Sequence, residues 1–399
     1  MSTLGIDFGT TNSSVSYIKP DGKPEAIRFI GHDLKMPSVI SFYSNPPMYG
    51  YEAQYLLDNI FGMQPVDQRL LVQKTVKSIK KILSPTSRIE GCSHQEIVAM
   101  FLRHLKEQAQ ESCPIQHFDK LVITHPVQFE EWKKKLYQDA AMQAGFNSVE
   151  LLYEPVSAAL GYLEKEQIKD IKGMLVYDFG GGTFDVAYVT KQDGNFIVPL
   201  PPKGDSNCGG DDIDDSIYKL IVRKSRQIFG NEYETTRDLG LLFQCRRWKE
   251  MLSSMENIPI SVISKNNPAN RYSDNLTRKD IEKVATPYID KTIALTKEVY
   301  DNVIENRLPI DFILLIGGSS GMPIIQEKIK ESLPGLEIRT TGSADIAVAL
   351  GASYYAVKPV TIAPENEWCY CIYDGKKILK SYNFCIYCGK HNFLKTGKF

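Results

Sequence analysis

The sequence predicts an α/β fold of two similar lobes that face each other across a cleft. The first observation is residues 176–185, where an apolar strand runs into Asp178, three glycines and Thr183 before a second strand leaves. The second observation is residues 5–13, which have the same order: strand, Asp-Phe-Gly, small hydroxyl residues, strand. A motif that recurs about half a chain apart indicates two similar structural units.

Each of these two segments predicts a hairpin whose tip can bind phosphate. Glycine has no Cβ, so its backbone can turn with positive φ and its N–H groups can approach an anion closely. Asp178, at the end of a strand, could hold a metal ion through water, and Thr183 offers a hydroxyl beside it. An acid, bare amides and a hydroxyl together suit a Mg²⁺-bound polyphosphate. The alternative is a pair of ordinary glycine turns.

The composition is that of a soluble globular protein. The 399 residues are enough for two or three domains, and 43% of them are apolar and 24% charged. The net charge of −1 excludes a general polyanion-binding chain. Residues 369–399, however, carry six Lys and one Asp. This basic tail could contact nucleic acid or an acidic partner, although a solvated surface is the more usual role of such a segment.

The N-terminus and the cysteines indicate a cytoplasmic protein. Residues 1–3 lead directly into a predicted core strand, without the basic and apolar regions of a signal peptide. No apolar run approaches the ~20 residues of a membrane helix. Eight cysteines in such a chain argue for free thiols or a metal site rather than disulfides.

The first lobe is expected to span residues 1–172. Apolar segments of strand length predict strands at residues 4–8, 14–19, 25–29, 38–43 and 120–124. Helices are expected at residues 67–83 and 129–144. Another helix begins after Ser93, because Ser93 followed by Glu96 forms a capping box.

The second lobe is expected to span residues 173–357. After its glycine hairpin, a helix is expected at residues 212–228. Thr277 with Asp280 caps a long helix that ends near Asn306. Residues 312–316 are expected to form a buried strand that leads to Gly317 and Gly318, and a closing helix is expected at residues 344–357.

The motifs resemble, in order, those of one known family. Beyond the two Asp-Phe-Gly segments, the resemblance rests on residues 78–83, 154–160, 208–214, 245–253, 317–323 and 344–352. Together they resemble the nucleotide-binding domain of the DnaK-type heat-shock protein 70 chaperones, in the actin-like ATPase superfamily. The resemblance runs from about Leu4 to about Val357. It implies a two-lobed fold of duplicated ribonuclease H-like domains, in which the closing helix packs back on the first lobe.

The resemblance also implies the residues of an ATP site. Asp7 and Asp178 would hold Mg²⁺ through water, and the catalytic residues would be Lys80, Glu154, Asp178 and Thr183. Judged without the resemblance, Lys80 is a surface lysine and Glu154 an acid at a helix N-terminus. The implied contacts to ATP, ADP or Mg²⁺ are Asp7, Gly9, Thr10, Thr11, Asn12, Gly180, Gly181, Gly182, Thr183, Asp185, Gly209, Gly210, Lys249, Gly317, Gly318, Ser319 and Asp345. The two glycines at 209 and 210 are expected to offer free N–H groups to phosphate or ribose. Pro126 would relay the nucleotide state.

The chain departs from the family at several positions. Arg246 replaces a glutamate of the family, Glu250 replaces its adenine-stacking arginine, and Gly321 replaces a second arginine. The adenine side of the site is therefore altered. Lys134 stands at the position of the family's interdomain arginine. Only about forty residues follow the second lobe, too few for the family's peptide-binding domain.

Residues 358–399 are expected to form a linker and a small zinc-ribbon-like tail. Cys369, Cys371, Cys385 and Cys388 could close a tetrahedral Zn²⁺ site, which would stabilise a module too small for its own core. The alternative is four unrelated thiols.

The resulting hypothesis is a slow ATPase of the chaperone type. Its partners would be a protein client and a J-domain or exchange-factor-like protein. A regulatory or scaffolding nucleotide switch, a pseudo-ATPase and a small-molecule kinase of the same superfamily are the alternatives.

Overall fold

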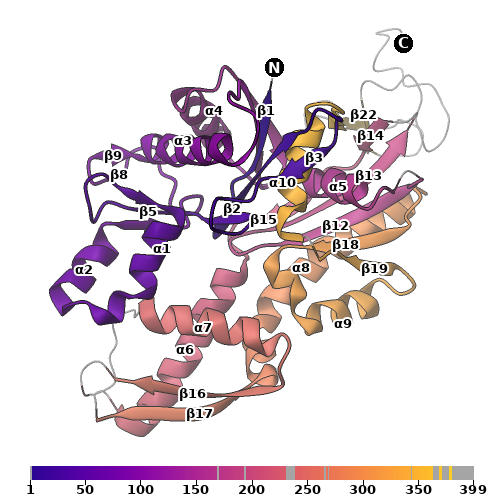
Figure 1. Ribbon diagram of the computed structural model, residues 1–399. Helices are drawn as coiled ribbons and strands as arrows, with labels where there is room; N and C mark the ends of the chain where they lie inside the picture. Colours follow the sequence, from indigo (N-terminus) through magenta and orange to yellow (C-terminus); the bar gives the residue numbers. More distant parts are fainter. Residues whose placement is uncertain are drawn as a thin grey trace.

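Two large sheets organise the protein (Figure 1). The structure is a computed structural model. It describes residues 2–168, 170–192, 195–230, 239–264, 267, 269–342, 344–362, 368–370 and 377–379.

The first sheet has the order β11–β10–β1–β2–β3, with β4 beside β2. β11, β10 and β1 run parallel, whereas β2 is antiparallel to both β1 and β3. The strands are Thr3–Asp7 (β1), Asn12–Ile18 (β2), Pro24–Ala26 (β3), Lys35–Pro37 (β4), Lys120–His125 (β10) and Ser148–Tyr153 (β11).

The second sheet repeats this topology in the order β19–β18–β12–β13–β14–β20, with β15 beside β13. β19, β18 and β12 run parallel, and β13 is antiparallel to β12 and β14. The mixed α/β duplication predicted from the two motifs is thus present in the backbone. The strands are Gly173–Phe179 (β12), Phe184–Gln192 (β13), Asn195–Val198 (β14), Lys203–Asp205 (β15), Phe312–Ile316 (β18), Glu337–Thr340 (β19) and Thr361–Ile362 (β20).

Two helices at equivalent places in the duplication pack against each other between the sheets. α5 (Glu154–Lys165) follows β11, and α10 (Ala344–Tyr355) follows β19. α10 also contacts β1 and β2, and α5 contacts β12 and β13 (Figure 1). A Cβ added to Gly161 or to Gly351 would collide with the backbone of the opposite helix, at Ala347 and Ser157 respectively. Glycine at these positions permits the close crossing.

The remaining parts of the first lobe flank its sheet. The expected helix at residues 67–83 is wrong: helix α2 ends at Gln73, and residues 75–77 form β7, which pairs with β5. The β-branched side chains of Thr75 and Val76 favour a strand, and Ser78 then has a φ of 49°. The elements are Val39–Ser41 (β5), Met48–Tyr49 (β6), Gly50–Asp58 (α1), Ile60–Gly62 (η1), Pro65–Gln73 (α2), Thr75–Lys77 (β7), Arg88–Ile89 (β8), Cys92–Ser93 (β9), His94–Ser112 (α3) and Glu131–Gln143 (α4).

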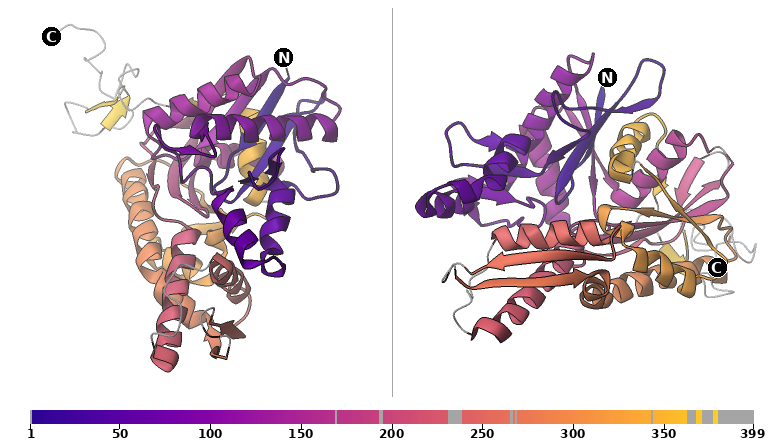
Figure 2. Two further views of the ribbon diagram at one scale, coloured as in Figure 1. Left: turned by 90° about the vertical axis from the view of Figure 1, so that its left-hand side faces the viewer. Right: turned by 60° about the horizontal axis from the view of Figure 1, so that its bottom comes forward.

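The second lobe carries a helical unit beside its sheet. Figure 2 shows the β16–β17 ribbon packed beside α7. The capping boxes predicted at Ser93–Glu96 and Thr277–Asp280 are both confirmed. The elements are Gly210–Phe229 (α6), Leu239–Leu252 (α7), Asn257–Ile263 (β16), Arg271–Thr277 (β17), Arg278–Glu305 (α8), Gly318–Gly321 (η3) and Pro323–Ser332 (α9).

The tail is described only at Trp368–Tyr370 (β21) and Lys377–Leu379 (β22), which pair antiparallel. Cys371, Cys385 and Cys388 lie outside the described residues, and of Cys369 only the backbone is described, so the zinc site stays a prediction. Within the described ranges, no group of three or more His, Cys, Asp or Glu side chains is arranged to hold a metal ion. The four cysteines whose side chains are described are free thiols. Among all the residues that the structure describes, each helix is too short or too polar to span a membrane.

Candidate functional site

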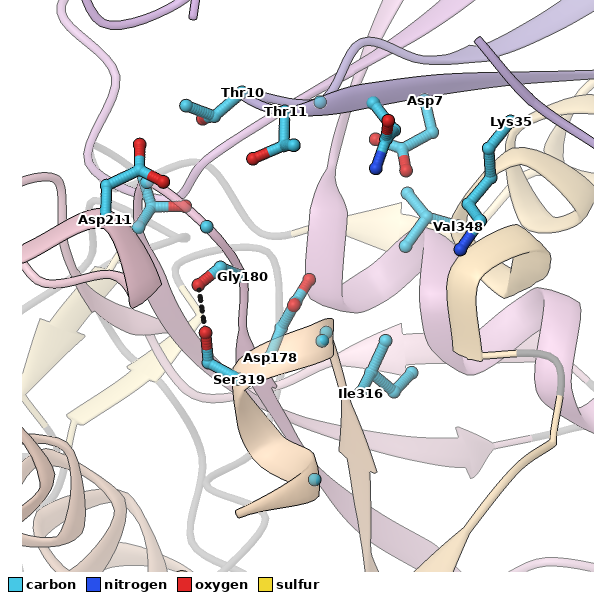
Figure 3. A pocket seen from close by; sticks show the side chains of 18 of the residues that line it. Asp7, Thr10, Thr11, Lys35, Asp178, Gly180, Asp211, Ile316, Ser319 and Val348 are labelled. Carbon is cyan, nitrogen blue, oxygen red and sulfur yellow. Dashed lines mark hydrogen bonds between the residues drawn. The ribbon is translucent and has the colours of Figure 1, made fainter. Parts of the chain in front are cut away.

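A cavity of about 520 Å³ lies between the two sheets. Asp7 at the end of β1 and Asp178 near the end of β12 both line it, and Figure 3 shows them on different sides of it. The sequence-predicted residues that line the cavity are Asp7, Gly9, Thr10, Thr11, Asn12, Lys80, Glu154, Asp178, Gly180, Gly181, Gly182, Thr183, Lys249, Gly317, Gly318 and Ser319. The duplicated fold therefore brings the two hairpin tips to one place.

The two hairpin tips touch each other. A Cβ added to Gly181 would meet Oγ1 of Thr11, and one added to Gly182 would meet Oγ1 of Thr10. Glycine is required here because of this close approach. Oγ1 of Thr11 is buried and, among the described residues, has no hydrogen-bond partner. A buried unsatisfied hydroxyl beside a cavity is suited to contact a ligand.

The glycine loop of the second lobe, at Gly180 and Gly181, accepts hydrogen bonds from the first residues of α6 and from η3. The N–H of Gly210 donates to the carbonyl of Gly180 at 3.0 Å, and the N–H of Asp211 donates to that of Gly181 at 2.8 Å. The Ser319 hydroxyl also donates to the Gly180 carbonyl, at 2.9 Å (Figure 3). These hydrogen bonds from α6 and η3 fix the loop.

Gly209 and Gly210 do not line the cavity, and their N–H groups are not free, contrary to expectation. The Gly209 N–H donates to the Asp212 carboxylate at 2.8 Å, and that of Gly210 donates to the glycine loop. Both residues brace the loop instead of offering amides to a ligand.

Lys80 and Glu154 form a buried ion pair at the cavity wall, and each residue is only 6% exposed. Burial opposes the charged form of Lys80, but the negative charges of Glu154 and Asp7 outweigh it and raise the pKa of Lys80. The raised pKa favours the charged form of Lys80, which lines the cavity and is not the surface lysine of the alternative interpretation.

Asp178 and Asp185 lie together in a strongly negative environment. Burial, with the charges of Glu154 and Asp7, raises the pKa of Asp178 to about 8. Burial and the charges of Glu154 and Asp178 raise the pKa of Asp185 well above its usual range. Buried carboxylates that raise each other's pKa favour either a shared proton or a bound cation.

Asp185 does not line the cavity, although the family resemblance implied a contact there. Its Oδ1 accepts a hydrogen bond of 2.8 Å from the N–H of Val127, the residue after Pro126. The acid therefore joins β13 of the second lobe to the loop after β10 of the first.

Lys249 lines the cavity, but its ammonium is already engaged. It lies 2.7 Å from Asp214 and donates to the Gly210 carbonyl at 2.8 Å.

The side chain of Asp345 is outside what the structure describes, so its expected contact is untested. Lys134 pairs with Glu131 at 2.6 Å within α4.

Several lining residues could not be identified from the sequence. Lys35 reaches the cavity from β4 (Figure 3), and Ser253 reaches it from the end of the α7 segment. Asp211 follows the two glycines that begin α6, and that position was the one available signal for it. Ser253 is the last residue of the motif 245–253, whereas Lys35 carries no local signal, since the pairing of β4 with β2 brings it to the cavity.

Three of the four departures from the family pattern line the cavity. Arg246 and Glu250 on α7 line the cavity and form an ion pair of 3.2 Å. Gly321, at the end of η3, also lines the cavity.

The cavity wall offers oxygen donors that suit a hard divalent cation held through water, since no three of the described carboxylates are arranged to bind an ion directly. Asp7, Glu154 and Asp178 contribute carboxylates, and Thr10 and Thr11 contribute hydroxyls. Oxygen donors of this kind, with space for water, are those that Mg²⁺ prefers. A cation would also stabilise the ionised form of Asp178, which burial disfavours.

A family model described as Hsp70 protein matches residues 68–360. The match covers well over half of the chain. It includes Lys80, Glu154 and the whole second sheet except β20, and it leaves out the first hairpin.

Proposed function

Because the chain belongs to the Hsp70 family, we propose that it binds a nucleoside triphosphate with Mg²⁺ between its lobes, ATP as in the family, and hydrolyses it slowly. The observation that carries the proposal is the position of Asp7 and Asp178. They end equivalent strands of a duplicated fold and reach one cavity beside two glycine loops.

Each side chain has a role that follows from its position. Asp7 and Asp178 would hold the waters of the metal ion, and Mg²⁺, when bound, would neutralise phosphate charge. Thr10, Thr11 and the loop Gly180–Thr183 would cradle the β- and γ-phosphates. The Lys80 ammonium would stabilise the charge that develops on the γ-phosphate, and the Glu154 carboxylate would orient the attacking water.

Hydrolysis would be coupled to motion of the lobes. The hairpin tips of both lobes would contact one triphosphate. Loss of the γ-phosphate would therefore remove a bridge between the two lobes. The hydrogen bond from Val127 to Asp185 also connects the lobes, next to Pro126. Nucleotide state would thereby change how far the cavity opens.

The proposed biological role is that of a cytoplasmic chaperone whose client is bound by another chain or by the tail. A J-domain or exchange-factor-like protein would regulate it. A purified protein that fails to suppress client aggregation, with or without nucleotide, would favour a nucleotide switch that binds no client. Glu250 and Gly321, which depart from the family pattern at the cavity, support the alternative of a pseudo-ATPase.

The test is titration calorimetry with ATP, ADP and GTP in the presence of Mg²⁺, combined with measurement of phosphate release. Asp7→Asn and Asp178→Asn should each abolish Mg²⁺-dependent turnover. Turnover that stays unchanged in both variants contradicts the proposed site. Zinc content of the wild type and of Cys388→Ser, measured by mass spectrometry, tests the tail; equal content in both rejects the zinc module.

A further inference from the structure

Lys35 lies in a row with Asp7 and Ser14 across the first sheet. β2 pairs with β1 and with β4, and Ser14 is opposite Asp7 in the first pairing and opposite Lys35 in the second. Directly paired residues of neighbouring strands point their side chains to the same face of a sheet. All three residues line the cavity, so the row faces it.

The spacing of this row places the Lys35 ammonium within reach of a group bound at Asp7. Directly paired residues lie about 5 Å apart, so two steps separate the Cα atoms of Asp7 and Lys35 by roughly 10 Å. The flexible four-carbon stem of lysine can cross much of this distance. In Figure 3, Lys35 lies on the other side of Asp7 from Thr10 and Thr11. A group bound at Asp7 would therefore have the first hairpin tip on one side and a cation on the other.

The cavity wall carries negative charge that phosphate groups would increase. Burial, together with the charges of Glu154 and Asp7, raises the pKa of Asp178 to about 8. Lys80 pairs with Glu154, so its charge balances a carboxylate of the protein as well as any phosphate. Lys35 adds positive charge to the wall from a different strand.

The proposed function places phosphate groups beside Asp7, and the inference drawn from Lys35 rests on it. An ammonium donates hydrogen bonds to phosphate oxygens and offsets their charge, as a metal ion does. Unlike the metal ion, it stays attached to the protein. We propose that Lys35 binds the phosphate groups of the nucleotide beside the metal ion, so that the protein retains nucleotide when Mg²⁺ is withdrawn.

The experiment measures the dissociation constants of ADP and of adenosine for the whole 399-residue chain, with Mg²⁺ and with EDTA, by titration calorimetry. The wild type should still bind ADP in EDTA. Lys35→Met should bind ADP in EDTA about 10- to 100-fold more weakly, because a hydrogen bond to a charged group is lost. With Mg²⁺ the loss should be smaller, since the metal ion neutralises the same phosphate groups. Adenosine has no phosphate and should bind both proteins equally.

Two further variants at residue 35 separate the charge from the fold. Lys35→Arg keeps a cation that binds phosphate and should retain ADP binding in EDTA. Lys35→Gln keeps a polar side chain in β4 and should show the same loss as Lys35→Met. Lys120→Met is the matched control, because Lys120 is also a half-buried strand lysine of the first sheet but does not line the cavity. It should bind ADP in EDTA as the wild type does.

Three results would overturn the role of Lys35 and leave the proposed nucleotide site standing. The first is a wild type that binds ADP with Mg²⁺ but not in EDTA. The second is binding of ADP in EDTA that is equal in Lys35→Met and the wild type. The third is a loss in Lys35→Met that is as large for adenosine as for ADP, which indicates a structural role. If the wild type binds ADP under neither condition, the proposed function itself fails, and the role of Lys35 with it.

Discussion

The ammonium of Lys77 lies 3.4 Å from the centre of the Phe243 ring, so β7 of the first lobe touches α7 of the second. Four residues further along, Lys81 lies 3.5 Å from Asp211 and 3.6 Å from Asp212, at the start of α6. These contacts hold the lobes together beside the cavity.

Lys77→Met should speed the release of bound nucleotide about two- to fivefold at pH 6, because a cation over an aromatic ring contributes roughly 0.5–1 kcal/mol. Burial lowers the pKa of Lys77 to about 7, against the charge of Asp58. The charge-dependent part of the contact is therefore present below pH 7 and lost above it. The wild type should release nucleotide faster at pH 8 than at pH 6, and the variant should lose this difference.

Stopped-flow release of a fluorescent nucleotide measures both effects. Lys74→Met is the matched control, since Lys74 pairs with Glu90 of its own lobe at 3.3 Å. If both variants accelerate release to the same extent, the contact with Phe243 does not restrain the lobes.

Lys80→Met should lower phosphate release by about a hundredfold or more, because a preorganised charge at the transferred phosphate is lost. It should also destabilise the fold by roughly 3–5 kcal/mol, since Glu154 would be left buried without its partner. Lys106→Met removes another buried lysine, which does not line the cavity and whose ammonium donates to the Gly145 carbonyl at 2.6 Å. That control should lose stability and keep its turnover per folded molecule. Turnover per folded molecule that is equal in the two variants would rule out a catalytic part for Lys80.

The parts of the fold that the sequence predicted are those specified locally. Asp7 and Asp178 could be paired because each ends an apolar strand before glycine, and the same hairpin recurs in both halves. The capping boxes at Ser93 and Thr277 needed only residues three apart. A capping box uses only residues at the helix start itself, so it does not depend on which distant segments pack nearby.

The parts that failed depend on distant segments. Residues 75–77 form a strand because Val39–Ser41 lies beside them, and no local pattern shows that partner. The N–H groups of Gly209 and Gly210 looked available, but Gly210 bonds to a loop thirty residues earlier. Lys35 reaches the cavity only because β4 pairs with β2. At each of these points the deciding contact comes from a segment that is distant in the sequence.

Gly351→Ala should destabilise the protein by roughly 1–3 kcal/mol, as overpacking of a close contact does. The added methyl group would collide with the carbonyl of Ser157 on α5, and backbone cannot move aside as a side chain can. Urea unfolding measures the loss. Gly62→Ala is the control, because a Cβ there meets nothing within 4 Å. Equal stability of the two variants would mean that α5 and α10 can separate without loss.

His125 should make the stability of the protein depend on pH between about 6.5 and 4. Burial lowers the pKa of His125 to about 4, and its ring packs between Phe129 and Tyr153. Below pH 6.5 the unfolded chain binds a proton at this residue and the folded chain does not. Stability is therefore retained above pH 6.5, falls as the pH drops, and levels off below pH 4.

His125→Phe removes this proton uptake and keeps an aromatic ring in the pocket. Its free energy of unfolding should fall by about 2 kcal/mol less between pH 7 and pH 5 than that of the wild type, because one unit of pKa shift is worth about 1.4 kcal/mol. Any pH-independent effect of the substitution cancels in this difference. His104→Phe should behave in the same way, since burial also lowers the pKa of His104 to about 4. If His125→Phe and the wild type lose equal stability between these two pH values, the pKa of His125 is not lowered by folding, which contradicts the prediction.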